Sequence, residues 1–215
     1  MQNKSLVIVS ILVLVGLFIG GGMYYKNAQT QKSVELAKQQ ALLFQRPYSV
    51  VVGNENAKVQ LVEFFDPACE TCALYHPYVK AILEKYEGDI KLVLRYAPFH
   101  KNSSHAVKML MGAKEQGMFM ETLEFMFATQ KYWTQHHKVK PNILWQMLGE
   151  VKGLDMTKLS EFMNDKSHDK IIKQDLADAE TLGVTKTPGY LVNGKPLQTF
   201  GLDNLIELIE SELNK

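Results

Sequence analysis

The fold is decided by one stretch of the chain, Leu61-Val62-Glu63-Phe64-Phe65-Asp66-Pro67-Ala68-Cys69-Glu70-Thr71-Cys72. The stretch begins as an apolar run typical of a strand, breaks at Asp66-Pro67, and restarts in a helical pattern at Cys69. A strand is therefore expected to deliver Cys69 and Cys72 to the first turn of a helix. These are the only two cysteines in the chain, and their spacing makes each the obvious redox partner of the other.

The position of the cysteines at the start of a helix predicts their chemistry. The first backbone N–H groups of a helix are unpaired, and the helix dipole favours an anion there. Cys69 is therefore expected to be a stabilised thiolate, which is the reactive form in disulfide exchange. Cys72 lies one turn deeper, where it is placed to attack a mixed disulfide formed on Cys69. The stretch thus predicts a thiol–disulfide exchange site.

A CxxC pair also has other interpretations, namely a structural disulfide, half of a metal site, or two thiols without a role. The chain has no second CxxC, and its six histidines form no HxxxH pair. His76 falls one turn after Cys72 and completes a CxxCxxxH pattern, which would suit a thiophilic metal such as copper(I). Redox chemistry is the favoured interpretation because of the strand–turn–helix context, and no metal site is assigned.

Composition excludes several classes of function. The net charge of the 215-residue chain is +1, and the chain has no basic block, so nucleic acid is not expected as a partner. The 14 glycines are scattered, with no phosphate-binding loop and no repeat of 20–50 residues. The length fits about one domain with an appendage.

The N-terminus reads as a membrane segment. Residues 5–25 carry no charge, and residues 6–19 are almost entirely Leu, Val, Ile and Phe, long enough to cross a bilayer as a helix. Residues 1–25 are therefore predicted to be an uncleaved transmembrane signal-anchor. A cleavable signal peptide is the alternative, because Gly20-Gly21-Gly22 supplies small residues. An anchor followed by a CxxC domain fits export, so the domain is expected on the extracytoplasmic, periplasmic side.

Residues 26–46 are polar and rich in Gln, Lys and Ala, with a narrow apolar stripe at helical spacing. The stripe predicts a helical stalk or linker that lifts the domain from the bilayer. The alternative is an association element that makes the protein a homo-oligomer through 26–46. Two heptads are fewer than a coiled coil usually needs, so the stalk is favoured.

Glu63 stands out within the strand predicted at 59–65. The strand alternates, and Glu63 shares its otherwise apolar face with Leu61 and Phe65. A carboxyl group on such a face is costly unless it has a partner or a function. Two interpretations stay open on pattern alone: an ion pair with Arg95 on the next strand, or a buried proton acceptor for Cys72.

The remaining elements follow from periodicity. Strand 59–65, a helix over 69–86 and a strand over 90–96 form a βαβ unit, preceded by a short strand at 48–52. Residues 102–182 show only helical patterns and predict an inserted helical subdomain. Asn193-Gly194 predicts a type I′ hairpin turn, and 202–213 a final amphipathic helix. Five methionines of the insertion are expected to line a core or groove rather than a metal site: Met109, Met111, Met118, Met120 and Met126.

In these residues the chain resembles the thioredoxin superfamily, and specifically its DsbA-like branch. The resemblance covers roughly residues 48–215 and rests on Glu63-Phe64-Phe65, the Cys69-x-x-Cys72 pair, the helical insertion, and Thr187-Pro188 before the hairpin. It implies an α/β, thioredoxin-like fold: a central mixed sheet, a βαβ unit, a β-hairpin and a C-terminal helix, with the helices of 102–182 inserted. The DsbA-like domain is accordingly placed at 47–215.

The resemblance also implies roles for single residues. Pro188 is expected to be cis and to lie against Cys69, while the backbone of Thr187 pairs with an extended substrate segment. Glu63 is expected to be the buried acid below the disulfide. Glu70 and Thr71, between the cysteines, are expected to contact substrate.

One departure from the strongly oxidising family members concerns that dipeptide, which is Glu70-Thr71 instead of Pro-His. A carboxylate beside the thiolate disfavours ionisation, so Glu70 is expected to raise the pKa of Cys69. The pair should then be a milder oxidant than those relatives.

The function implied is a membrane-tethered, extracytoplasmic thiol–disulfide oxidoreductase that exchanges disulfides with exported proteins. Its expected partners are cysteine-containing clients and a protein that reoxidises or reduces the pair. No dissociable cofactor is expected, because Cys69 and Cys72 carry the electrons. The alternatives are a disulfide isomerase or reductase of the same fold, and a copper(I)-binding protein that uses the cysteines.

Overall fold

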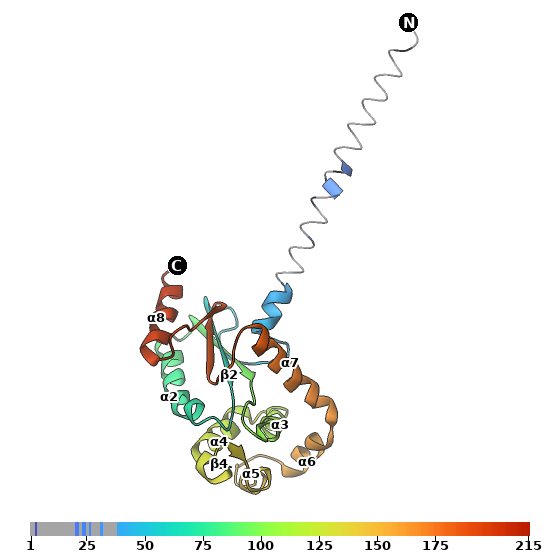
Figure 1. The fold of residues 1–215 in the computed structure, drawn as a ribbon, viewed down its shortest axis with the longest axis vertical. Coiled ribbons are helices and arrows are strands. Elements are labelled where there is room, and N and C mark those ends of the chain that lie inside the picture. The colour runs from blue at the N-terminus through green and yellow to red at the C-terminus, as the bar shows by residue number, and fades with distance from the viewer. Residues whose placement is uncertain (1–2, 4–19, 22, 25, 27–30, 32–37) are drawn as a thin grey trace. The chain divides into compact units, whose positions relative to one another are not determined.

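The computed structural model describes residues 3, 20–21, 23–24, 26, 31 and 38–215 of the chain (Figure 1). The chain divides into two units, Met1–Leu43 and Phe44–Lys215. Most of the anchor expected at 1–25 and residues 27–30 and 32–37 of the stalk expected at 26–46 lie outside the described residues. Within the described part, no helix combines the length and the hydrophobicity that crossing a membrane requires. The second unit contains all the elements that follow.

A five-stranded mixed sheet forms the centre of this unit, in the order β1-β3-β2-β6-β7. The strands are β1 (Val50–Gly53), β2 (Val59–Phe65), β3 (Ile90–Tyr96), β6 (Gly189–Val192) and β7 (Lys195–Pro196). β2 runs parallel to β3, while β1 pairs with β3, and β6 with β2, in the antiparallel sense. The predicted strand 59–65 has these bounds, and the expected mixed sheet is confirmed.

Helices cover both faces of the sheet. α2 (Glu70–Lys85) connects β2 to β3, and α8 (Leu202–Leu213) has the predicted bounds. α2 and α8 lie together on one side of β2, and α7 (Asp169–Thr181) lies on the other (Figure 1). The alternation of β2 produces two cores, because Leu61 and Phe65 pack into the larger cluster while Val62 and Phe64 pack into the smaller one beside α7.

The helical insertion lies between β3 and β6. It contains α3 (Ser103–Lys114), α4 (Phe119–Trp133), α5 (Pro141–Leu148), α6 (Met156–Asn164), a short 3-10 turn η1 (Lys166–His168) and α7. Asp155 caps α6, as its side chain accepts hydrogen bonds from the backbone N–H groups of Thr157 and Lys158. Met109, Met111 and Met126 are buried in the larger core, as expected for core residues.

The expectation of an all-helical insertion is wrong. Besides helices it holds a small hairpin, β4 (Thr134–Gln135) and β5 (Lys138–Val139), whose turn residues His136 and His137 have φ of 48° and 57°. The hairpin has no glycine at these left-handed positions, so it lacked the usual turn signal. Asn102 is the N-cap residue of α3, and its side chain donates to the Val139 carbonyl of β5.

The turn between β6 and β7 is as predicted. Asn193 and Gly194 have φ of 46° and 80°, which fits the two left-handed residues of a type I′ turn. The second strand of this hairpin, β7, is short and ends at Pro196. Proline has no N–H to continue the ladder, although the Leu197 N–H still donates to the Tyr190 carbonyl over 2.9 Å.

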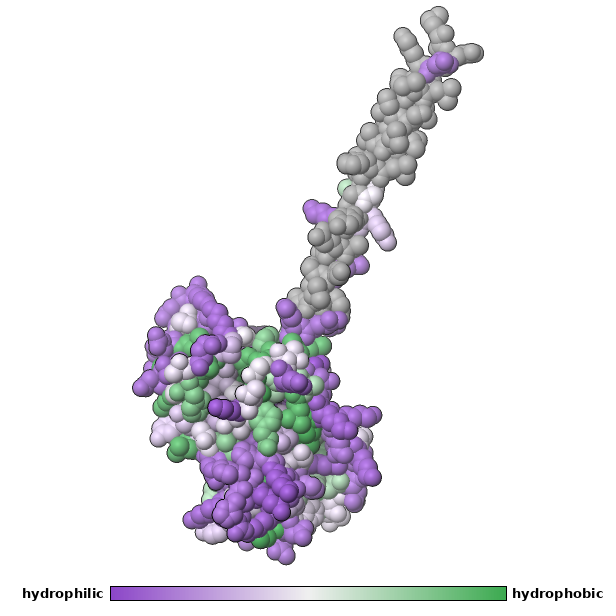
Figure 2. Space-filling model, viewed as in Figure 1, coloured by the Kyte–Doolittle hydropathy of each residue, from purple (hydrophilic) through white to green (hydrophobic). Residues whose placement is uncertain are grey.

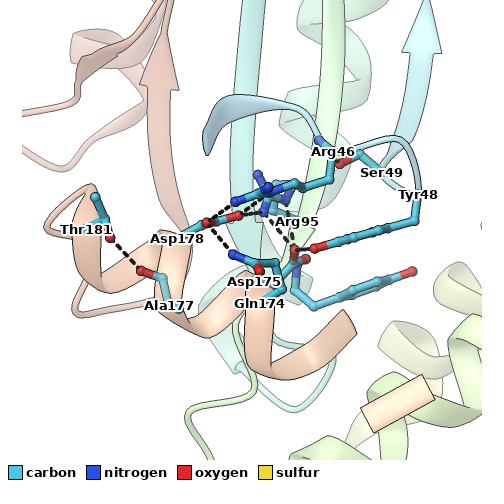
Figure 3. A network of polar contacts seen from close by, with 10 residues as sticks. Arg46, Tyr48, Ser49, Arg95, Gln174, Asp175, Ala177, Asp178 and Thr181 are labelled. Carbon is cyan, nitrogen blue, oxygen red and sulfur yellow. Dashed lines mark hydrogen bonds and ion pairs between the residues drawn. The ribbon is translucent and has the colours of Figure 1, made fainter. Parts of the chain in front are cut away.

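A buried charge network ties α7 to the sheet (Figure 3). Arg95 of β3 is fully buried and donates to the carboxylates of Asp175 and Asp178 from α7. The Tyr48 hydroxyl donates to Asp175 over 2.7 Å, and Arg46 makes two further hydrogen bonds to Asp178. Removing one member would leave a buried charge without its partner, at a cost of roughly 3–5 kcal/mol. The network fixes α7 and the chain around Arg46 against the sheet.

Candidate active site

A short turn places Cys69 at the start of α2. The Cys69 N–H donates to the Asp66 carbonyl over 3.0 Å, and the Ala68 N–H donates to the Asp66 carboxylate over 2.9 Å. Cys69 is the N-cap residue of α2, with φ of −81° and ψ of 119°. The sequence break at Asp66-Pro67 therefore creates the helix start that the cysteine spacing predicted.

The helical insertion holds the same turn from the other side. The buried side-chain amide of Gln130, on α4, donates to the carbonyls of Pro67 and Cys69 over 2.8 and 3.0 Å. These two carbonyls come just before α2 and at its N-cap, so one side chain from the insertion supports the backbone of Cys69. No local sequence feature predicted this contact, because Gln130 fits the helical pattern of its neighbours.

Cys69 and Cys72 are both free thiols in this structure. The Cys69 thiol donates to the Thr187 carbonyl over 3.2 Å. The pKa of Cys69 is lowered to about 5, first because the Cys72 thiol donates to its sulfur, and further through the Thr187 side chain and the backbone N–H groups of Cys72 and Thr71. These donors outweigh burial, which acts in the opposite direction.

Cys72 lies in a contrasting environment. Its side chain is fully buried, and this burial is the main cause that raises its pKa well above the ordinary value. Its hydrogen bond to Cys69 and the nearby charges of Cys69 and Glu63 act in the same direction. The two thiols of the pair are thus held in opposite states near neutral pH.

Glu63 is a buried acid on β2, and 3% of its surface is exposed. Burial raises its pKa to about 8, and the hydrogen bond that the Tyr190 hydroxyl donates over 3.4 Å opposes this shift. The alternative of an ion pair with Arg95 is wrong. Arg95 binds Asp175 and Asp178 and packs on Phe64, on the opposite face of the sheet.

The Thr187–Pro188 peptide bond is cis, as the resemblance implied, and the Thr187 carbonyl contacts the sulfur of Cys69. The Thr187 hydroxyl is buried without a hydrogen-bond partner, so it is available as a donor when Cys69 is ionised. A groove of about 570 Å³ runs beside this loop. Its lining includes Thr71, Val184, Lys186, Pro188, Leu197 and Phe200.

The pKa of Cys69 is lowered, as expected for a thiolate at a helix start, and hydrogen bonds to the sulfur are the main cause of the lowering. Glu70 is not among the main causes of this shift. The Glu70 side chain is exposed, and its carboxylate lies 3.7 Å from Nδ1 of His137 on the β4–β5 turn. Thr71, by contrast, contributes a backbone N–H to the sulfur and lines the groove.

His76, the third member of the CxxCxxxH pattern, packs on Phe127 with ring centroids 5.2 Å apart. Its Nε2 lies 3.9 Å from the Glu124 carboxylate. Among the residues that the structure describes, no three His, Cys, Asp or Glu side chains are grouped so as to hold a metal ion.

Exposed apolar side chains occur near the cysteines. Leu74 and Tyr78 project from α2, and Phe200 packs on Tyr75 with ring centroids 4.8 Å apart. Figure 2 shows hydrophobic residues gathered over the part of the molecule that holds the sheet, while the end formed by α4 and α5 is mostly hydrophilic. The groove beside Pro188 thus lies next to a surface suited to apolar peptide segments.

A CxxC pair at a helix start, a cis-proline loop against its first sulfur and an inserted helical subdomain are the features by which the chain resembles the DsbA-like branch of the thioredoxin superfamily. A family model described as Thioredoxin matches residues 45–211. The chain belongs to that family.

Individual proteins agree with the class. A putative protein-disulfide oxidoreductase of Rickettsia typhi is 24% identical over 168 residues, which cover 76% of this chain and 62% of that protein. The crystal structure of oxidised BdbD from Bacillus subtilis superimposes with a TM-score of 0.68 at 23% identity, covering 78% of this chain and 94% of that one. For Wolbachia pipientis alpha-DsbA1 the TM-score is 0.69 at 20% identity, covering 81% and 96%.

The match to one further relative is partial. A Na(+)/H(+) antiporter NhaA of Herminiimonas arsenicoxydans is 28% identical over 146 residues, which make up 68% of this chain but only 22% of the antiporter. The chain thus spans about a fifth of that relative and less than two thirds of the Rickettsia typhi protein.

Proposed function

We propose that the protein is a membrane-tethered, extracytoplasmic thiol–disulfide oxidoreductase that exchanges disulfides with exported proteins through Cys69 and Cys72. One observation carries the proposal: the pKa of Cys69 is lowered to about 5, while that of Cys72 is raised well above its ordinary value. A structural disulfide does not need two cysteines of different pKa. An exchange centre does, because one sulfur must react with clients while the other stays protonated and buried.

In the oxidising direction the centre begins as the Cys69–Cys72 disulfide. A client thiolate attacks Cys69, forming a client–Cys69 disulfide, and the electron pair of the broken bond goes to Cys72. A second client thiolate then attacks the client sulfur, and Cys69 leaves as a thiolate. The client is oxidised by two electrons and the pair is reduced to a dithiol. The low pKa of Cys69 makes it a good leaving group.

Glu63 supplies the proton that this cycle needs. Cys72 leaves the disulfide as a buried thiolate, and its high pKa requires prompt protonation. With a pKa of about 8, Glu63 is mostly protonated at neutral pH and acts as the acid. In the reducing direction Cys69 attacks a client disulfide, and ionised Glu63 accepts the Cys72 proton so that Cys72 can release the client.

The cis-proline loop supplies the contact with the client backbone. The Thr187 backbone, beside the Cys69 sulfur, pairs with an extended client segment, and Pro188 presents no N–H to the sulfur. Phe200 and Thr71 border the same groove and contact the client side chains.

The reduction potential tests this function. A thiolate pKa of about 5 lies between the values of about 7 for thioredoxin and about 3.5 for DsbA. The corresponding potentials are about −270 and −120 mV, so we expect a value between them. The measurement is equilibration of the full chain in detergent with glutathione buffers, followed by alkylation of the remaining thiols.

The reduction potential also indicates whether the protein oxidises or reduces its clients. A potential near or above about −180 mV supports donation of disulfides to clients, and one near −270 mV supports a reductase or an isomerase kept reduced by its partner. A pair that never forms the intramolecular disulfide would contradict the exchange function and favour the copper(I) alternative.

The tether has a separate test. The apolar run at 6–19 supports an anchor, and the lowered thiol pKa suits an oxidising compartment. We expect the full chain to stay with membranes after an alkaline carbonate wash, and its cysteines to react with a membrane-impermeant maleimide in spheroplasts. Release by the wash would contradict the anchor. Light scattering of the same sample distinguishes a monomer from an oligomer assembled through 26–46.

A further inference from the structure

Two histidines lie beside the turn that carries Cys69, although the Glu70-Thr71 dipeptide itself holds no positive charge. His100 follows β3, and its Nδ1 lies 2.7 Å from the carboxylate of Asp66. The backbone N–H of His100 donates to the same oxygen over 3.0 Å. His137 lies on the β4–β5 turn, and its ring stacks on that of His100 with centroids 5.6 Å apart.

Asp66 explains why a charged imidazole is stable at this place. Its carboxylate is fully buried and accepts hydrogen bonds from the Ala68 N–H, the Ser103 hydroxyl and His100. Ala68 and Ser103 contribute neutral donors, whereas the His100 ring can also carry a positive charge. A buried carboxylate strongly favours such a partner, because pairing offsets part of its desolvation.

The charged groups around His100 come from three elements. Asp66 belongs to the turn before α2, and Cys69 and Glu70 belong to its first residues. His137 faces His100 from the hairpin, with the Glu70 carboxylate 3.7 Å from its Nδ1. Lys101 and Lys138 flank the two histidines and are bridged through their backbones. Negative groups thus surround His100 on the side of the sulfur.

Resting on the proposed function, we propose that His100 is a positioning residue whose imidazolium, held by Asp66, stabilises the Cys69 thiolate and so makes the pair a stronger oxidant as the pH falls. The sign follows from the two redox states. The thiolate exists only in the dithiol form, so a positive charge beside it stabilises the reduced pair and raises the reduction potential. Loss of the imidazolium proton at higher pH removes this contribution.

The titration of the ring agrees with this geometry. The pKa of His100 is raised above its ordinary value, first by the hydrogen bond to Asp66 and then by the charges of Asp66, Cys69 and Glu70. Coupling between two sites is reciprocal, so a thiolate that raises the pKa of His100 is itself stabilised by the imidazolium. Since Cys69 titrates near 5, His100 is charged throughout that titration.

The first experiment uses the unaltered full chain in detergent. The pKa of His100 is measured by NMR of the ring protons in the dithiol and the disulfide forms. We expect a higher pKa in the dithiol form, by about one unit, because only that form has the thiolate. Equal pKa values of His100 in the two forms would overturn the inference. This experiment does not depend on the folding of any variant.

The second experiment separates charge from structure. In His100→Asn the side-chain amide replaces the Nδ1–H donor to Asp66 but cannot ionise. We expect the pKa of Cys69, measured by thiolate absorbance, to rise by about one unit. The equilibrium constant for reduction of the pair by glutathione should fall about tenfold at pH 6. The difference in this constant between wild type and variant should become smaller as the pH rises through the His100 titration. His105→Asn, a matched change of an exposed histidine on α3, should change neither quantity.

The outcomes for this inference and for the function are distinct. Normal exchange by His100→Asn with an unmoved Cys69 pKa and potential would overturn the role of His100 and leave the oxidoreductase function intact. A wild-type chain that forms no Cys69–Cys72 disulfide would refute the function itself. A loss of stability without a pH-dependent change in potential would mark His100 as merely structural and also overturn the inference.

Discussion

Cys69→Ser is expected to abolish disulfide exchange, whereas Cys72→Ser is expected to convert the protein into a trap for its clients. Near pH 7 a thiol of pKa about 5 is roughly 99% thiolate. The Cys72 thiol, whose pKa is raised well above its ordinary value by burial, stays protonated at this pH. Cys72 is also fully buried, so it cannot replace Cys69 as the attacking sulfur.

The two variants differ in what they accumulate. With Cys69 intact and Cys72 absent, a mixed disulfide forms on Cys69 and cannot be released from within the pair. We expect about one client per chain on non-reducing gels for Cys72→Ser, and none above background for Cys69→Ser. The measurement is a peptide disulfide carrying a reporter, with the double serine variant as the blank. Mixed disulfides on Cys72 in the Cys69→Ser variant would contradict the assignment of roles.

Local pattern predicted the elements that position this centre. The alternation of residues 59–65, the break at Asp66-Pro67 and the turn at Asn193-Gly194 each involve neighbours in sequence, and each was found where expected. The positions of Cys69 and of the cis Pro188 required more, since their meeting depends on pairing β2 with β6 across more than a hundred residues. The resemblance supplied that pairing, which periodicity does not contain.

The features of the site that the sequence did not predict depend on tertiary contacts. Arg95 pairs with Phe64 in strand register and lies on the opposite face from Glu63, and its partners on α7 are 80 and 83 positions away. Gln130 contacts the Cys69 turn from the inserted subdomain and His100 from the segment after β3, and neither has a sequence signature. The stabilised Cys69 thiolate was expected from the helix start, but the hydrogen bonds from Cys72 and Thr187 that lower its pKa depend on the tertiary fold and on side-chain geometry.

Glu63→Gln is expected to stabilise the reduced protein increasingly as the pH rises. The folded state raises the pKa of Glu63 from 4.5 to about 8, so between these values the folded state holds a proton that the unfolded state has released. Stability then falls with rising pH by up to about 1.4 kcal/mol per unit. Glutamine resembles the protonated acid, still accepts from Tyr190, and does not titrate. The advantage of the variant should reach on the order of 4 kcal/mol at pH 9 and vanish near pH 4.5.

The pH dependence of Glu63 must be measured as a difference between variant and wild type, because Cys69 also changes stability with pH. Its pKa is lowered on folding, so its contribution to stability rises with pH and offsets that of Glu63 in the wild-type chain. Apart from the interaction between the Cys69 charge and Glu63, the contribution is common to both proteins and cancels in their difference. The measurement is urea unfolding of both reduced proteins at pH 5, 7 and 9, with Glu55→Gln at an exposed position as the matched control. A difference that stays flat across this range would mean that Glu63 is ionised inside the fold, and an ionised Glu63 could not protonate the departing Cys72.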